Sequence, residues 1–295
     1  MKNIVIAILG LIIIGLVVVF LVFKEGDTYV NETPATEELP IPVEIDEGIG
    51  DGAEPLPEEP AADTNAPITI GQSVSGNAIE LHRFGTGAKE VLVVGGVHSG
   101  FAPNTVTVAE NLRAGLEAGS VVVPDGLTVS VITNLNPDAQ KAPNTLAGRL
   151  NSNNVDLNRN FDCDWSANGT WRATPVSGGD AAFSEPEAQA IRDYVAGRDI
   201  AAAVVYYAAD GGVYASNCGG ALDATIATLT GTYATAAGYT ANEEFTAYTV
   251  SGDLTNWLAK TGVPAIGVLL SDYENAEWRE NQAGIKAVLN TVAGN

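Results

Sequence analysis

The chain has 295 residues, which is enough for one medium-sized domain and additional segments. Asp and Glu number 36 against 14 Lys and Arg, so the formal net charge is −22. This balance excludes proteins that bind nucleic acid through a basic face, because they neutralise phosphates with Lys and Arg.

A run of apolar residues near the N-terminus predicts a membrane-spanning helix. Residues 4–23 contain no charged side chain and are long enough to cross a bilayer. Lys2 precedes the run, whereas Glu25 and Asp27 follow it, so the N-terminus is expected to be cytoplasmic. Residues 1–24 are therefore predicted to anchor a single-pass membrane protein whose remaining domain is extracytoplasmic. A cleaved signal peptide is the alternative.

An acidic, proline-rich segment follows the predicted anchor. Residues 25–66 contain six prolines, many Asp and Glu residues, and no Lys or Arg. Such a segment cannot bury enough apolar surface to offset the entropy lost on ordering. We expect it to be a disordered linker.

Strands and helices are predicted to alternate in the remaining domain, residues 67–295. Hydrophobic patterns and turn residues indicate strands at 79–84, 91–97, 127–134, 201–207 and 264–270. The same patterns indicate helices at 105–118, 184–196, 221–237, 254–260 and 277–293, and Ser184 is the predicted cap of the second. This alternation predicts an α/β sheet covered by helices on both faces.

Several polar motifs fall after or between these elements. The strand beginning at Val91 runs into a Gly-Gly turn and His98, and ligand sites of such sheets lie beyond the carboxyl ends of strands. The sequence Asn-Val-Asp-Leu-Asn-Arg-Asn-Phe-Asp occupies residues 154–162, and Phe-Ser-Glu-Pro-Glu occupies residues 183–187. Tyr248 lies further on, just before a Ser-Gly pair.

Taken in this order, these motifs resemble those of the zinc carboxypeptidase family, the carboxypeptidase A-like metallopeptidases. The resemblance covers about residues 68–295. It implies a phosphorylase/hydrolase-like fold with a mixed, mostly parallel eight-stranded sheet and helices on both faces. It also implies hydrolysis of the C-terminal residue of a peptide, or of related cell-wall peptides.

The resemblance assigns four residues to substrate binding. Asn158 and Arg159 match the pair that holds the terminal carboxylate of the substrate. Arg149 matches the arginine that stabilises the oxyanion, and Tyr248 matches the tyrosine that folds over the substrate. These roles suit the residue types, because guanidinium groups bind carboxylates bidentately and a fixed cation stabilises developing negative charge.

A structural role is the alternative for the two arginines. Either guanidinium can instead pair with an acidic side chain of the same segment, such as Asp156 or Asp162.

The zinc-binding half of the family pattern is mostly missing. The family binds zinc with a histidine, a nearby glutamate and a second histidine, and a further glutamate is its general base. His98 matches the first histidine, but Ala102, Ala208 and Leu269 stand at the other ligand positions and at the base position. Catalytic zinc needs three protein ligands. We therefore expect His98 to be vestigial, no metal or other cofactor to be bound, and no catalytic residue to remain.

A rearranged site is the alternative. Asp210 would then supply an oxygen ligand, Asp272 or Glu274 would act as a displaced base, and zinc would be the cofactor. His82, the only other histidine, lies on an early strand and is expected to be structural or at the surface.

The two cysteines, Cys163 and Cys218, predict a disulfide outside the cytoplasm. Two buried free thiols are the alternative.

Together these features predict a membrane-anchored carboxypeptidase-like domain that has lost hydrolysis but binds peptide or cell-wall peptide C-termini. An active metallocarboxypeptidase and a purely structural surface domain are the two alternatives. The expected partners are a peptide C-terminus and the membrane, with no nucleic acid.

Overall fold

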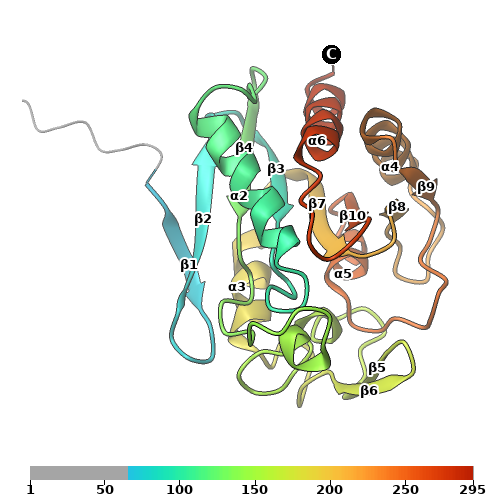
Figure 1. Cartoon of the computed structure of the whole chain (residues 1–295). Helices are drawn as coiled ribbons and strands as arrows, with labels where there is room; N and C mark the ends of the chain where they lie inside the picture. Colours follow the sequence, from blue (N-terminus) through green and yellow to red (C-terminus); the bar gives the residue numbers. More distant parts are fainter. Residues whose placement is uncertain (1–65, 295) are drawn as a thin grey trace, which may run out of the picture. The chain divides into compact units, whose positions relative to one another are not determined.

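A mixed eight-stranded sheet is the central element of residues 66–294, which are the residues that the computed structural model describes (Figure 1). Its strands are β1 (Ile68–Gln72), β2 (Ala78–Phe84), β3 (Lys89–Val94), β4 (Leu127–Ile132), β7 (Ile200–Ala208), β8 (Gly212–Ala215), β9 (Thr240–Asn242) and β10 (Ala265–Leu270). They are ordered β1-β2-β4-β3-β7-β10-β8-β9. The four central strands, β4, β3, β7 and β10, run parallel to one another.

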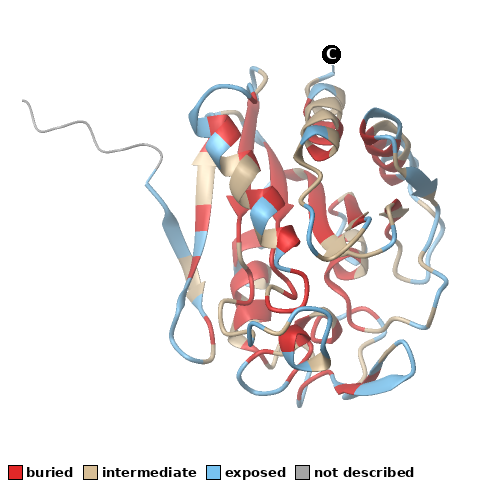
Figure 2. Ribbon diagram, in the orientation of Figure 1, coloured by how far each residue is buried: buried red, intermediate tan, exposed pale blue. Residues whose placement is uncertain are grey.

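Within residues 66–294, five α-helices cover the two faces of this sheet. They are α2 (Asn104–Glu117), α3 (Pro186–Val195), α4 (Ala224–Ala237), α5 (Leu254–Lys260) and α6 (Trp278–Ala293). Buried residues of α2, α4 and α6 form one apolar cluster with one face of the sheet, and those of α3 and α5 form a second cluster with the other. Strand β3 contributes Val91 and Val93 to the first cluster and Leu92 and Val94 to the second, as strand alternation requires. The central strands are accordingly buried, while the edge strand β1 and the outer helix faces are largely exposed (Figure 2).

Short irregular elements connect β4 to α3. They are the 3-10 helices η1 (Leu146–Arg149) and η2 (Leu157–Arg159) and a two-stranded hairpin of β5 (Asn168–Trp171) and β6 (Thr174–Ser177). This stretch carries the Asn-Arg-Asn-Phe-Asp motif.

The predicted mixed, mainly parallel sheet with helices on both faces is confirmed. All ten predicted elements are present, with ends that differ by a few residues. The predicted capping of α3 by Ser184 was wrong, because Glu185 is the residue that precedes the helix and no side chain caps it. Five short strands, β1, β5, β6, β8 and β9, were not predicted, because three to five residues carry too little periodicity.

The predicted anchor and nearly all of the predicted linker lie outside the described residues. Within residues 66–294, no helix is both long enough and apolar enough to span a membrane.

Candidate functional site

A pocket of about 710 Å³ opens where the parallel strands end. His98 follows β3, Ala208 ends β7 and Leu269 lies on β10, and all three line the pocket. Strands β3, β7 and β10 are neighbours in the sheet, so three segments far apart in sequence meet at one edge. This position agrees with the rule that α/β sheets place ligand sites beyond the carboxyl ends of their strands.

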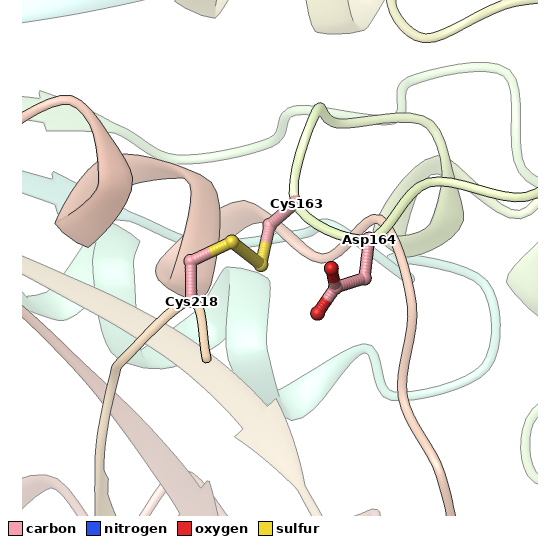
Figure 3. A group of neighbouring side chains, drawn as sticks. All are labelled: Cys163, Asp164 and Cys218. Atoms are coloured by element: carbon pink, nitrogen blue, oxygen red, sulfur yellow. A yellow bond between two sulfur atoms is a disulfide. The ribbon is translucent and has the colours of Figure 1, made fainter. Parts of the chain in front are cut away.

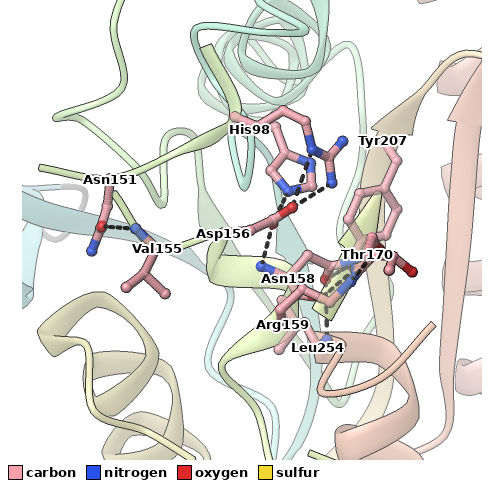
Figure 4. Close-up of polar contacts among 10 residues, drawn as sticks. His98, Asn151, Val155, Asp156, Asn158, Arg159, Thr170, Tyr207 and Leu254 are labelled. Atoms are coloured by element: carbon pink, nitrogen blue, oxygen red, sulfur yellow. Dashed lines mark hydrogen bonds and ion pairs between the residues drawn. The ribbon is translucent and has the colours of Figure 1, made fainter. Parts of the chain in front are cut away.

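Asp156 holds together several of the polar residues that line this pocket (Figure 4). One carboxylate oxygen accepts a hydrogen bond from Nε2 of His98 at 2.7 Å and another from the backbone N–H of Asn158 at 3.1 Å. The other oxygen accepts from Nε and Nη2 of Arg149, at 3.1 and 2.8 Å. Asp156 has no exposed surface, so its charge is compensated entirely by these buried partners.

Burial and charge shift the pKa values of the pair formed by His98 and Asp156. Burial, reinforced by the nearby charge of Arg149, lowers the pKa of His98 to about 4. Burial alone would raise the pKa of Asp156, but the charge of Arg149 and the contact with His98 outweigh it and hold that pKa well below its usual range. At neutral pH His98 is therefore uncharged and donates Nε2–H to an ionised Asp156, which leaves the Nδ1 lone pair as an acceptor.

Arg159 is a buried cation without a carboxylate partner among the described residues. Only 1% of its surface is exposed. Its Nε and Nη2 donate to the carbonyl oxygen of Thr170, at 3.0 and 2.7 Å, and its Nη1 donates to the carbonyl of Asn158 at 2.6 Å. A guanidinium has five N–H donors, so one remains on each terminal nitrogen. Arg159 lines the pocket, where these donors are suited to an anion.

Asn158 presents a second polar group to the pocket. Its Oδ1 accepts hydrogen bonds from the hydroxyl of Tyr207 at 2.9 Å and from the backbone N–H of Leu254 at 3.1 Å. Two donors on one atom identify it as the carbonyl oxygen, so the amide nitrogen is the other atom and has no partner among residues 66–294. Burial raises the pKa of Tyr207 well above its usual range, which keeps its hydroxyl protonated as a donor.

Tyr207 was missed by the sequence analysis. Its position next to Ala208, on the strand expected to end at the site, was the signal that could have found it.

Tyr248 also lines the pocket, and its ring packs against a neighbouring aromatic ring. Its ring lies 4.9 Å from that of Phe245, which lies 5.4 Å from that of Tyr214, and all three residues line the pocket. The structure therefore brings the four residues assigned to substrate binding, Arg149, Asn158, Arg159 and Tyr248, to one pocket. Arg149 is at the same time the arginine that pairs with Asp156, whereas Asp162 pairs with Lys260 at the surface.

The donor atoms around His98 do not fit a catalytic zinc ion. Its only carboxylate neighbour within 4 Å among the described residues is Asp156, which Arg149 also holds. Ala102 contributes backbone hydrogen bonds to the turn after His98, and the Phe101 ring lies against Arg149 at 5.2 Å. Neither side chain offers an oxygen or nitrogen ligand, and the same is true of Ala208 and Leu269.

The side chains considered for a rearranged site do not converge on His98 either. Asp210 lines the pocket but is hydrogen-bonded by the Tyr214 hydroxyl. Asp272 accepts hydrogen bonds from Glu274 and Asn275 and does not line the pocket. Within residues 66–294, the only three His, Cys, Asp or Glu ligand atoms close enough to share an ion belong to Cys163, Asp164 and Cys218.

Cys163 and Cys218 form a disulfide, as predicted, with their Cα atoms 5.7 Å apart (Figure 3). Both sulfurs are consumed by this bond, so the group that includes Asp164 is not a metal site. The bond ties the segment that follows Arg159 to the loop after β8, where Asn217 lines the pocket. The alternative of two free thiols is excluded.

The fold and the site define a carboxypeptidase-like domain, and comparison with known proteins gives the family. The model of the zinc carboxypeptidase family matches residues 61–290. The chain therefore belongs to the zinc carboxypeptidase family.

Solved structures share this fold at low sequence identity. Carboxypeptidase A from Helicoverpa armigera is 18% identical with a TM-score of 0.59, over 78% of this chain and 68% of that chain. Murein-tripeptide amidase from Escherichia coli O157 is 19% identical with a TM-score of 0.56, over 79% of this chain and 96% of that chain. A metallo-carboxypeptidase from Burkholderia cenocepacia is 16% identical with a TM-score of 0.56, over 79% of this chain and 65% of that chain. A search of the curated proteins gave no match.

Proposed function

We propose that this protein is a non-hydrolytic member of its family that binds the C-terminal carboxylate of a peptide or cell-wall peptide. Residues 1–24 anchor it in the membrane as a single-pass protein with a cytoplasmic N-terminus. The domain that begins at residue 67 then lies on the extracytoplasmic side, joined to the anchor by the acidic segment of residues 25–66.

The observation that carries this proposal is that Arg159 is buried without a carboxylate partner among the described residues. A cation that is 99% buried without a carboxylate partner among the described residues is costly unless a ligand supplies negative charge. Arg159, with its free N–H donors, and Asn158 line the same pocket. A terminal carboxylate offers two acceptor oxygens to these donors, which is the geometry that guanidinium groups bind best.

The absence of hydrolysis is supported by the donor set around His98. Zinc chemistry in this family generates the attacking water on the metal. Here the described residues supply one histidine, two alanines and a leucine at the corresponding positions, and a leucine cannot accept a proton from water. The residues that remain can hold and orient a carboxylate end, but they leave the adjoining bond without a nucleophile. Resemblance to murein-tripeptide amidase favours cell-wall peptides among the possible ligands.

Peptide titration of the full chain in detergent tests the carboxylate site. A short peptide with a free C-terminus should bind, and the same peptide with an amidated C-terminus should bind at least about tenfold more weakly, because charge-assisted hydrogen bonds are lost. Arg159→Gln should reduce affinity for the free peptide by a similar factor. Arg192→Gln, which changes an arginine of α3 paired with Asp193 outside the pocket, is the matched control and should have no effect.

Two results separate the alternatives. Stoichiometric zinc in the purified protein together with release of C-terminal residues would establish an active metallocarboxypeptidase. Equal affinity for free and amidated peptides would exclude carboxylate recognition and leave the structural surface domain.

A further inference from the structure

A second arginine of the pocket, Arg172, also lacks an ion-pair partner among the described residues. The described residues include eight arginines, and six of them have a carboxylate oxygen within 4.0 Å. The remaining two are Arg159 and Arg172, and both line the same pocket. In a chain of net charge −22, carboxylates are abundant, so two unpaired guanidinium groups in one cavity call for an anionic ligand.

We propose that Arg172 forms a second anion subsite, which selects ligands carrying an acidic side chain just upstream of their C-terminal residue. This inference rests on the proposed function, since it assumes that Arg159 and Asn158 hold the terminal carboxylate. It adds the substrate class, an acidic peptide end with two negative groups.

Arg172 is held in place by its neighbours although it is exposed. It is the first residue of the two-residue turn between β5 and β6, where Trp171 pairs with Thr174 (Figure 1). Its guanidinium lies 5.0 Å from the centroid of the Trp171 ring, and Nη2 donates to the hydroxyl of Tyr273 at 3.0 Å. These contacts reduce the entropy that a free arginine would lose on binding.

The backbone at this position is unusual for an arginine. Its φ angle is 55°, in the left-handed region that favours Gly, Asn and Asp. The turn itself would be formed more easily by Gly, Asn or Asp. The arginine at this position is therefore better explained by a role of its side chain.

One hairpin connects the two unpaired cations. The carbonyl oxygen that accepts from the Arg159 guanidinium belongs to Thr170, two residues before Arg172 (Figure 4). The hairpin that carries Arg172 is therefore hydrogen-bonded directly to the guanidinium of Arg159.

Aromatic packing places Arg172 on the Arg149 side of the pocket. The Arg149 guanidinium lies 4.9 Å from the centroid of the Trp171 ring, the same ring that the Arg172 guanidinium contacts. Phe101 packs edge-on against both Trp171 and Tyr273. This wall therefore carries two guanidinium groups, which attract a carboxylate-bearing side chain upstream of the bound terminus.

Acidic residues of the pocket come from other segments. Asp210 follows β7, Glu244 lies in the loop that carries Tyr248, and Asp253 is the buried cap of α5, where its carboxylate accepts hydrogen bonds from Thr255 and Asn256. They repel a second carboxylate from their own segments, so an acidic side chain is directed toward Arg172 and the ligand is oriented.

Three acetylated tripeptides, Ala-Glu-Ala, Ala-Gln-Ala and Ala-Lys-Ala, test the inference when titrated against the full chain. The Glu peptide should bind about fivefold more tightly than the Gln peptide, the size expected for a solvent-accessible ion pair. Arg172→Asn removes the guanidinium and tolerates the left-handed backbone, so it should erase the difference in affinity between the Glu and Gln peptides. Arg279→Gln, an exposed arginine of α6 outside the pocket, is the control and should keep the preference.

The outcomes separate the two proposals. Equal binding of the Glu and Gln peptides, or a preference for the Lys peptide, would overturn the role of Arg172 and leave carboxylate recognition by Arg159 intact. A Glu preference that survives in Arg172→Asn would overturn it as well. Failure of every peptide to bind the unaltered protein would overturn both proposals.

Discussion

Asp156 shows how one buried carboxylate sets the state of a whole site. It fixes the tautomer of His98, neutralises Arg149 and caps the turn that presents Asn158. Arg159, three residues later, receives no such partner among the described residues. Two arginines of one short segment therefore differ in charge pairing: Arg149 is paired with a carboxylate, and Arg159 is bonded only to backbone carbonyl oxygens.

The lowered pKa of His98 predicts a loss of stability on mild acidification. In the unfolded chain this histidine takes up a proton near pH 6.5, but in the folded protein it does so only near pH 4. The unfolded state thus binds more protons between these values, and the free energy of unfolding should fall by about 3 kcal/mol as the pH drops from about 6.5 to about 4.

Urea unfolding of the chelator-treated protein at several pH values measures this effect. In His98→Gln the pH dependence over this window should be reduced by most of that amount, whereas His82→Gln, which changes the other histidine, should retain it. Identical slopes in both variants would contradict the assignment to His98.

At the scale of elements, the contact between α4 and α6 depends on one glycine. A Cβ at Gly284 of α6 would lie 2.5 Å from the ring of Tyr233, a buried residue of α4. The Tyr233 hydroxyl in turn donates to Asn281 at 2.7 Å and lies 3.1 Å from the hydroxyl of Tyr206 on β7. Because three elements share this ring, it cannot move to make room.

We therefore expect Gly284→Ala to lower the free energy of unfolding by about 1–3 kcal/mol through overpacking. Gly231→Ala in α4 is the matched change, because a Cβ there meets no atom within 4 Å. It should stabilise the protein by about 0.5–1 kcal/mol, since alanine is the better helix former. Denaturant unfolding of both variants checks the opposite signs, and destabilisation by both would mean that helix propensity is not the deciding term.

The longer elements could be predicted because their own sequences carry the signal. Strands such as 264–270 are continuous apolar runs, and α5 was predicted with the bounds that the structure gives it. The β5–β6 hairpin, which positions Thr170 and Arg172, has neither alternation nor a standard turn sequence, so its role could not be foreseen.

At the scale of the whole molecule, we expect that zinc does not change the thermal stability of the folded protein. A metal that binds only the folded state at 100 times its dissociation constant stabilises it by about 2.7 kcal/mol, which is roughly 5–10 °C in Tm for a domain of this size. With the ligand set described around His98, added zinc and added chelator should each shift Tm by less than about 1 °C.

Thermal unfolding with the Cys163–Cys218 disulfide intact is the appropriate measurement, because free thiols would bind metal in the unfolded chain. A rise of several degrees with zinc that disappears in His98→Asn would show that a metal site exists and would contradict this expectation.

The sequence by itself determined the family, the alternation of strands and helices, the cysteine pair and the identity of the residues at the site, because these depend on residue types and their local order. Tertiary structure alone decided which charges are paired. From the sequence, Asp156 could form an ion pair with either arginine of its segment. In the structure it pairs with Arg149, because the turns of η1 and η2 bring these two groups together in a buried space. Whether a buried charge is compensated depends on distances across the fold, which local sequence does not encode. That difference left Arg159 and Arg172 free of carboxylate partners among the described residues.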